Sequence, residues 1–302
     1  MDRAALLGMA GIAIADDNSV AGIVRAHTRA RHHARCIAER AAWDAQHAQI
    51  GPPRPAHIPA PPSLPRAAPR LIPAARIVMS DAPPVTVLPV GRTGWRNLCR
   101  LISLGRLRSA KGACDLQLAD LLARCGDAQM ILWPEGAWQD AARQLAVQAP
   151  GQVHVMLRPH YDGRDGRRWD QIAAEAQAID VPTVACATPL MHHGERRRLA
   201  DVLTAIRQGT QVDALGDAAL VNAERRLRSA TEMQHLYEAH AAAVARAGTL
   251  AAQLGFSLDA LRYEYPSEVT DNETPDARLE RLAYEGLQWR YPQGAPAHVQ
   301  KL

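Results

Sequence analysis

Short apolar runs alternate with helical stretches along most of this 302-residue chain, and this alternation limits the folds open to it. The runs contain β-branched residues and are bounded by proline, glycine or aspartate, as buried strands usually are. They fall at residues 11–15, 85–88, 129–133, 152–157 and 181–185. Strands alternating with helices at this period predict a barrel-like α/β fold with a mostly parallel sheet.

Residues 181–209 show the alternation most clearly. Residues 181–185 form an apolar β-branched run, Pro189 ends it, and residues 195–208 return to a helical spacing. The apolar positions on one face of that helix are Leu199, Val202, Leu203 and Ile206. In α/β barrels the residues just past the carboxyl end of a strand line the active site. Thr188, Leu190, His192 and His193 therefore occupy positions where chemistry is expected.

The composition indicates a folded chain from a reducing compartment. Hydrophobic residues make up 47% of the sequence, and the net charge of +4 is a mild excess, more typical of a solvated surface than of a nucleic-acid tail. The five cysteines are scattered without a C-x-x-C pair, and no run approaches 18 apolar residues. These features predict a cytoplasmic protein that does not enter a membrane.

Two acidic residues follow the first apolar run. Asp16 and Asp17 at a strand end could bind a hard cation. Asn18 or Ser19 could instead cap the next helix, whose start an aspartate would also favour, and this alternative is preferred. In that helix, predicted over residues 20–48, adjacent histidines point about 100° apart, so a metal site at His32, His33 and Cys36 is disfavoured.

A proline-rich segment interrupts the pattern at residues 51–73. It contains nine prolines in 23 residues. Proline removes a backbone donor and fixes φ, so such a segment favours an extended polyproline conformation over helix or central strand. We predict a surface insertion here.

Three segments carry motifs that resemble one family. Residues 195–209 contain E-R-R and D-V-L-T-A-I-R-Q-G, residues 91–105 contain N-L-C-R-L-I-S, and residues 256–266 read F-S-L-D-A-L-R-Y-E-Y-P. They resemble the polymerase-and-histidinol-phosphatase (PHP) domain of bacterial C-family DNA polymerases, specifically the error-prone branch. The resemblance covers nearly all of the chain except the proline-rich segment. It implies a distorted (β/α)7 barrel and a role in translesion DNA synthesis, DNA repair and replication.

The same resemblance implies that metal ligands have been lost. Thr188 and Leu190 stand where the family has an aspartate and a histidine, and Asp17 stands where it has another histidine. The family's first strand, with its His-x-His pair, has no counterpart before residue 11, so we expect an open barrel whose exposed first strand promotes self-association. No bound cofactor is expected in this chain. The vestigial metal candidates are Asp16, Asp17, His160 and His192.

We expect two regions. Residues 1–220 are predicted to form the partial barrel, and residues 221–302 a helical linker toward the polymerase palm. Thr274 and Pro275 are expected at the N-cap and first position of a helix ending near Trp289. The family's magnesium-binding aspartates lie in the palm, beyond the matching segment, so this chain alone is expected to be inactive. The implied partners are the remainder of the polymerase, DNA, and a sliding clamp or mutagenesis accessory proteins.

Two other functions remain open. One is a metal-dependent PHP phosphoesterase or exonuclease that uses the vestigial metal candidates. The other is a module that binds DNA or a partner protein through arginines, since guanidinium groups contact phosphate. Interspersed Glu195 and Glu224 make a solvated surface the more common outcome for such a region. The candidate arginines are Arg196, Arg197, Arg198, Arg225, Arg226 and Arg228.

Overall fold

A computed structural model describes residues 1–47, 68–262 and 273–299 of the chain. It contains two compact units, residues 1–260 and 261–302. The predicted division at residue 220 falls inside the first unit, because helical residues beyond 220 pack against the sheet. Most of the predicted proline-rich insertion, residues 51–67, lies outside the described residues.

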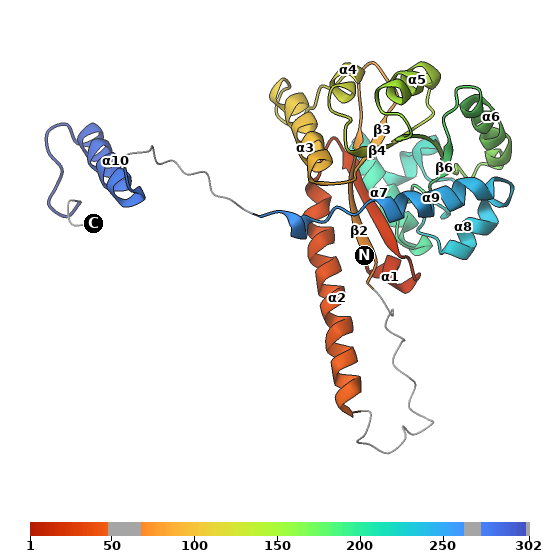
Figure 1. The fold of residues 1–302 in the computed structure, drawn as a ribbon, viewed down its shortest axis with the longest axis horizontal. Helices are drawn as coiled ribbons and strands as arrows, with labels where there is room; N and C mark the ends of the chain where they lie inside the picture. Colours follow the sequence, from red (N-terminus) through yellow and green to blue (C-terminus); the bar gives the residue numbers. More distant parts are fainter. Residues whose placement is uncertain (48–67, 263–272, 300–302) are drawn as a thin grey trace. The chain divides into compact units, whose positions relative to one another are not determined.

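The first unit is built on a single curled sheet of six strands arranged in sequence order (Figure 1). β1 and β2 are parallel, β3 runs antiparallel to both of its neighbours, and β4, β5 and β6 are parallel. The sheet is therefore less uniformly parallel than the alternation predicted. Within the described part of the chain, β1 and β6 each pair with one strand, so the sheet stays open. The strands are β1 (Gly11–Asp17), β2 (Arg70–Ile77), β3 (Val85–Pro89), β4 (Ala128–Leu132), β5 (Val153–Leu157) and β6 (Thr183–Ala185).

All five predicted strands are present, although β1 contains no buried residue. Every residue of β3, β4 and β5 is buried. The expectation that the proline-rich segment extends to Pro73 is wrong, since β2 begins at Arg70 and Pro73 pairs with Ile14 of β1. Proline is tolerated there because β3 pairs with β2 only from Ala75 onward, so the missing N–H has no strand partner on that side.

One face of the sheet is covered by helices that follow the strands (Figure 1). Ile77, Val87, Met130 and Val155 from the sheet pack with Leu98, Leu121 and Leu145 from the helices. Each helix buries a stripe of apolar residues at helical spacing, which is the main source of its stability. The helices on this side include α3 (Arg92–Leu107), α4 (Leu118–Leu122) and α5 (Trp138–Gln148), and α6 (Asp165–Gln177) contributes Ala176.

The other face is covered by a helix from the region predicted to be a linker. Leu250 of α9 (Ala241–Gln253), together with Leu254, packs on Ile72, Ile131 and Met156. The side chain of Arg70 also donates to the backbone carbonyls of Leu254 and Ala251. Residues 241–254 are therefore part of the core of the first unit.

The described part of the first unit also contains the α-helices α1 (Asp2–Leu6), α2 (Ala21–His47), α7 (Arg197–Gln208) and α8 (Ala230–Leu236). The predicted helix after residue 195 is confirmed as α7, which ends at Gly209 in the left-handed region at φ 65°. Its orientation is unexpected. Asp201 and Ala205 are buried, whereas the exposed fractions of the four apolar residues are 49% for Leu199, 39% for Val202, 55% for Leu203 and 70% for Ile206.

The second unit contains α10 (Pro275–Arg290). The Thr274 side chain accepts a hydrogen bond from the backbone N–H of Ala277 at 3.2 Å, and Pro275 occupies the first turn, which confirms the predicted cap. Arg281 pairs with Glu273 at 2.9 Å. Among the helices described in either unit, none is both long and apolar enough to cross a membrane.

Candidate functional site

The two acidic residues at the end of β1, Asp16 and Asp17, make contacts with α2 and β2. The carboxylate of Asp16 accepts a hydrogen bond from the backbone N–H of Gly22 at 2.7 Å, in the first turn of α2, and Ser19 accepts from Ala21 at 3.2 Å. Asp17 pairs with the guanidinium of Arg76 at 2.6 and 3.0 Å. The contacts of Asp16 and Ser19 with the first turn of α2 are those expected of helix-capping residues. Asp17 adds an ion pair with Arg76.

Asn18 links β1 to the segment after β2. Its side chain donates to the carbonyl of Val78 at 3.0 Å and accepts from the N–H of Val78 at 2.9 Å. The backbone of Asn18 has φ 44°, a conformation that asparagine tolerates better than most residues. This turn directs the chain from the strand into α2.

His160 lies at the carboxyl end of β5, beside a cleft of about 510 Å³. Arg158, Arg168 and Glu135 line the same cleft. Partial burial lowers the pKa of His160, and the positive charges of Arg158 and Arg168 lower it further. Asp165 and Asp162 oppose this shift and both pair with Arg168, so charges of both signs surround His160.

The candidates after β6 do not converge on His160 or Asp16. His192 is exposed, and the side chain of Leu190 is 54% exposed. Thr188 has φ 38°, and its hydroxyl is buried without a hydrogen-bond partner. In the described ranges, no three His, Cys, Asp or Glu side chains are grouped to hold a metal ion.

The three residues His32, His33 and Cys36 do not share one partner. His33 lies 2.7 Å from the carboxylate of Asp2, which also accepts hydrogen bonds from Arg29. These contacts hold the pKa of Asp2 well below its usual range, with the Arg29 hydrogen bond as the main favourable cause. His32 instead lies 3.6 Å from the sulfur of Cys36.

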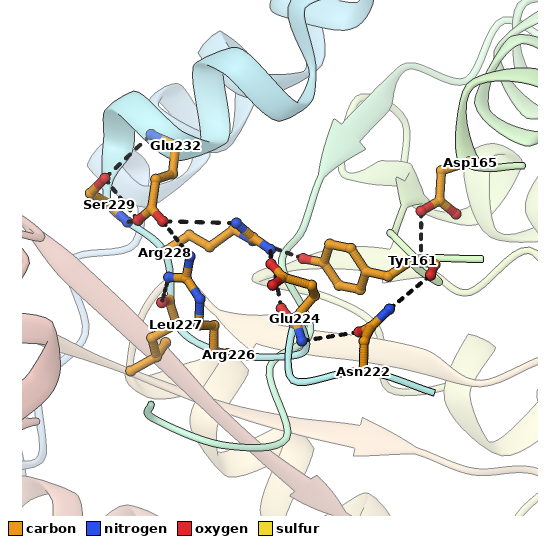
Figure 2. A network of polar contacts seen from close by, with 9 residues as sticks. All are labelled: Tyr161, Asp165, Asn222, Glu224, Arg226, Leu227, Arg228, Ser229 and Glu232. Atoms are coloured by element: carbon orange, nitrogen blue, oxygen red, sulfur yellow. Dashed lines mark hydrogen bonds and ion pairs between the residues drawn. The ribbon is translucent and has the colours of Figure 1, made fainter. Parts of the chain in front are cut away.

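The candidate arginines fall into three groups. Arg196 and Arg198 are exposed, and Arg197 lies 3.6 Å from the carboxylate of Asp201. Arg226 and Arg228 belong to a polar network with acidic partners (Figure 2). Arg225 makes no ion pair in the described part of the chain.

Arg228 is the centre of the network in Figure 2, which we call the Arg228 network. Its side chain is 9% exposed, donates to the hydroxyl of Tyr161 at 2.9 Å, and pairs with Glu224. Glu232 accepts from Arg226 at 2.6 Å and from the N–H of Ser229 at 2.8 Å, and these bonds lower its pKa to about 2. Every charge at the centre of this network therefore has an opposite partner.

A second arginine group, which the sequence analysis did not identify, lies at the carboxyl ends of the strands. The guanidinium carbon of Arg76 is 4.7 Å from the centre of the Trp133 ring, and that of Arg158 is 5.0 Å from it. Trp133 is buried, and its indole N–H donates to the hydroxyl of Thr86 at 2.9 Å. We call Arg76 and Arg158 the arginine cluster. Arg158 and Trp133 each follow the last residue of a buried strand, a position that could have identified them.

The comparisons with known proteins identify the relatives of this chain. No family model matches it. An error-prone DNA polymerase of Ruegeria pomeroyi is 42% identical across 99% of the chain, which spans 28% of that protein. Those of Rhodopseudomonas palustris and Sinorhizobium medicae are 37% and 36% identical across 97% of the chain, which spans 24% of each. The chain is thus homologous over nearly its whole length to these error-prone DNA polymerases, and it spans about a quarter of the length of each.

Proposed function

We propose that this chain is the PHP-type portion of an error-prone DNA polymerase and acts as a non-catalytic support for the rest of the enzyme. The homology supports membership in the polymerase, and the motifs of residues 91–105 and 195–209 support the PHP assignment. Among the described residues, Asp16, His160 and His192 are not grouped to hold a metal ion, which supports a non-catalytic role. Translesion synthesis, DNA binding, magnesium chemistry and contacts with a clamp or accessory proteins would then belong to the whole polymerase.

The apolar face of α7 carries this proposal. Leu203 and Ile206 share one side of α7 and are 55% and 70% exposed, whereas Asp201 of the same helix is buried. The carboxylate of Asp201 accepts a hydrogen bond from the N–H of Leu220 at 3.0 Å, which fixes the polar side of α7 toward the domain. Contiguous exposed apolar side chains with a polar rim are typical of interaction surfaces. The occupant we propose is the remainder of the polymerase chain.

A binding experiment tests this role. The chain is co-expressed with the Ruegeria pomeroyi polymerase from which the matching segment has been removed, and the two are purified through a tag on one of them. We expect a stable complex with the unaltered chain, and at least a roughly tenfold loss of affinity for the double variant Leu203→Glu and Ile206→Glu, which places charge in the apolar contact. The matched control is Leu107→Glu, because Leu107 is 87% exposed on α3.

Equal binding by the α7 variant and the Leu107 variant would contradict the docking role. The non-catalytic part of the proposal is tested with the purified chain, a primed template, deoxynucleotides and Mg²⁺ or Mn²⁺. We expect neither primer extension nor release of nucleotides. Metal-dependent release of phosphate or nucleotides that disappears in His160→Ala would instead support the phosphoesterase alternative.

A further inference from the structure

The outward face of α3 carries arginines and no acidic residue. Arg92, Arg96 and Arg100 are exposed and recur every four residues, so they lie along one side of the helix. The opposite side is buried against the sheet and includes Leu98 and Leu101. None of the 16 residues of α3 is an aspartate or a glutamate. We call Arg92, Arg96 and Arg100 the α3 stripe.

The positive charges of the α3 stripe are not neutralised by the groups around the helix. In the ranges that the structure describes, none of its three arginines makes an ion pair or a side-chain hydrogen bond. The carboxylate at the start of α3 belongs to Asp127, and it accepts a hydrogen bond from the backbone N–H of Gly94 at 2.8 Å. In the last turn, Arg106 donates to the backbone carbonyl of Asn18 at 2.9 Å. The guanidinium groups of the stripe are therefore free to meet an anion.

This arrangement of charge works against the stability of α3. Like charges four residues apart repel each other on a helix, and a cation in the first turn, such as Arg92, opposes the helix dipole. The arginines of α2 show the more favourable arrangement, because Arg29 pairs with Asp2 at 2.7 Å and Arg35 pairs with Glu39 at 3.5 Å. A surface that only faces solvent gains from such mixed charges. The α3 stripe departs from that pattern, which indicates an anionic partner.

We propose that the α3 stripe binds the sugar-phosphate backbone of duplex DNA without reading its sequence. An α-helix rises 1.5 Å per residue, so successive arginines of the stripe are about 6 Å apart along its axis. Duplex DNA presents phosphates at short, regular intervals, and each guanidinium can donate two hydrogen bonds to one phosphate. Contacts of this kind position a protein on DNA but carry no base information. The stripe thus adds a DNA contact within this chain to the support role proposed above.

The surroundings favour duplex DNA over a single strand or a protein. Sites for single strands combine cations with aromatic rings on which bases stack. Trp95 of α3 is only partly exposed, and its ring stacks on that of Phe256 at 5.3 Å between centres, so it is already engaged. Protein interfaces have an apolar and aromatic core, whereas the stripe consists of arginines. The surface is also separate from the cleft beside His160, because the described lining of that cleft includes no residue of α3.

Fluorescence anisotropy with the 302-residue chain and a labelled duplex of mixed sequence tests this surface at several salt concentrations. We expect a Kd of roughly 1–100 μM at physiological salt, as for other sequence-independent contacts. Replacing all three arginines of the stripe by glutamine should weaken binding by about tenfold or more. It should also reduce the slope of log K against log salt by roughly 2–3, because about one counterion per lost phosphate contact is no longer released. The matched control removes three exposed charges from α5, α7 and α10 and should leave the affinity unchanged: Arg143→Gln, Arg207→Gln and Arg290→Gln.

Two further measurements separate charge from folding and from other polyanions. Replacing the three arginines by lysine should retain most of the affinity, since lysine keeps the charge but loses the planar fork. The glutamine variant should melt at or above the temperature of the unaltered chain, because repulsion along α3 has been removed. Equal DNA binding by the stripe variant and its control would overturn the proposal, as would competition by a single strand or by polyglutamate as effective as that by unlabelled duplex. None of these results depends on whether α7 docks to the rest of the polymerase.

Discussion

Arg225 and Arg228 are three positions apart, yet they lie in opposite electrostatic environments. Arg228 is buried with Glu224, Glu232 and the hydroxyl of Tyr161 around it (Figure 2). Arg225 has no carboxylate partner in the described residues, and burial lowers its pKa, with a further lowering from the charge of Arg158. The comparison teaches that a buried arginine stabilises a fold when opposite charges match it, whereas a partly buried arginine without a carboxylate partner carries a desolvation cost that nothing around it offsets.

The largest expected effect comes from breaking the Arg228 network. Arg228→Met should lower the free energy of unfolding by about 3 kcal/mol, because it removes the ion pairs to Glu224 and Glu232 and the hydrogen bond to the Tyr161 hydroxyl. Urea unfolding followed by circular dichroism measures this loss. A change smaller than that of Arg198→Gln would show that the network does not stabilise the domain.

Acid should weaken the same network through Glu232. Its pKa in the folded protein is about 2, below the ordinary value of 4.5, chiefly because of the hydrogen bond from Arg226. The stabilisation is therefore complete above pH 4.5 and is lost as the pH falls toward 2. Because the carboxylate is 34% exposed, we expect only about 1 kcal/mol from it.

The measurement is the difference in unfolding free energy between the unaltered chain and Glu232→Gln at several pH values. The difference should shrink as the pH falls from 4.5 toward 2. The subtraction is needed because His154 also titrates: burial lowers its pKa to about 4, so folding loses stability as the pH falls from 6.5 toward that value. A constant difference across the acid range would contradict the role of Glu232.

The smallest expected effect on the free energy of unfolding comes from replacing Arg225. Arg225→Met should change the free energy of unfolding by less than about 0.5 kcal/mol, or should raise it slightly. The same substitution chemistry at Arg228 is the control. If Arg225→Met destabilises the protein as much as Arg228→Met does, Arg225 has a structural partner and the two regions are equivalent.

Sequence reasoning was most successful where the signal is local. The strands were predicted because a buried strand is apolar over its whole length, and the cap at Thr274 was predicted because its residues act on the next turn. The reversal of β3 was missed, since apolar patterning does not encode strand direction. The exposed face of α7 was missed because periodicity predicts an apolar face but not whether anything covers it.

The arginine cluster could be predicted in part, whereas the surroundings of Arg225 could not. Arg158 and Trp133 follow strand ends, where a barrel-like fold places functional residues. Arg225 gave no such signal, because the sequence Arg225-Arg226-Leu227-Arg228 contains three arginines whose partners depend on distant segments. Tyr161, which accepts a hydrogen bond from Arg228, lies 67 positions away from it in the sequence. Thr188, which accepts one from Arg225, lies 37 positions away.

The covering of the sheet by α9 has a consequence for synthesis on the ribosome. Arg70 and Leu254, which are bonded in the folded domain, are separated by 184 positions. At roughly 5–20 residues per second, one face of β2 would wait on the order of 10–40 s for the helix that covers it. During that interval Ile72 and Ile131 lack their final partner, so the nascent chain exposes an apolar surface that chaperones recognise. Folding of this domain is therefore expected to finish late in translation, and to depend on the segment that was predicted to be only a linker.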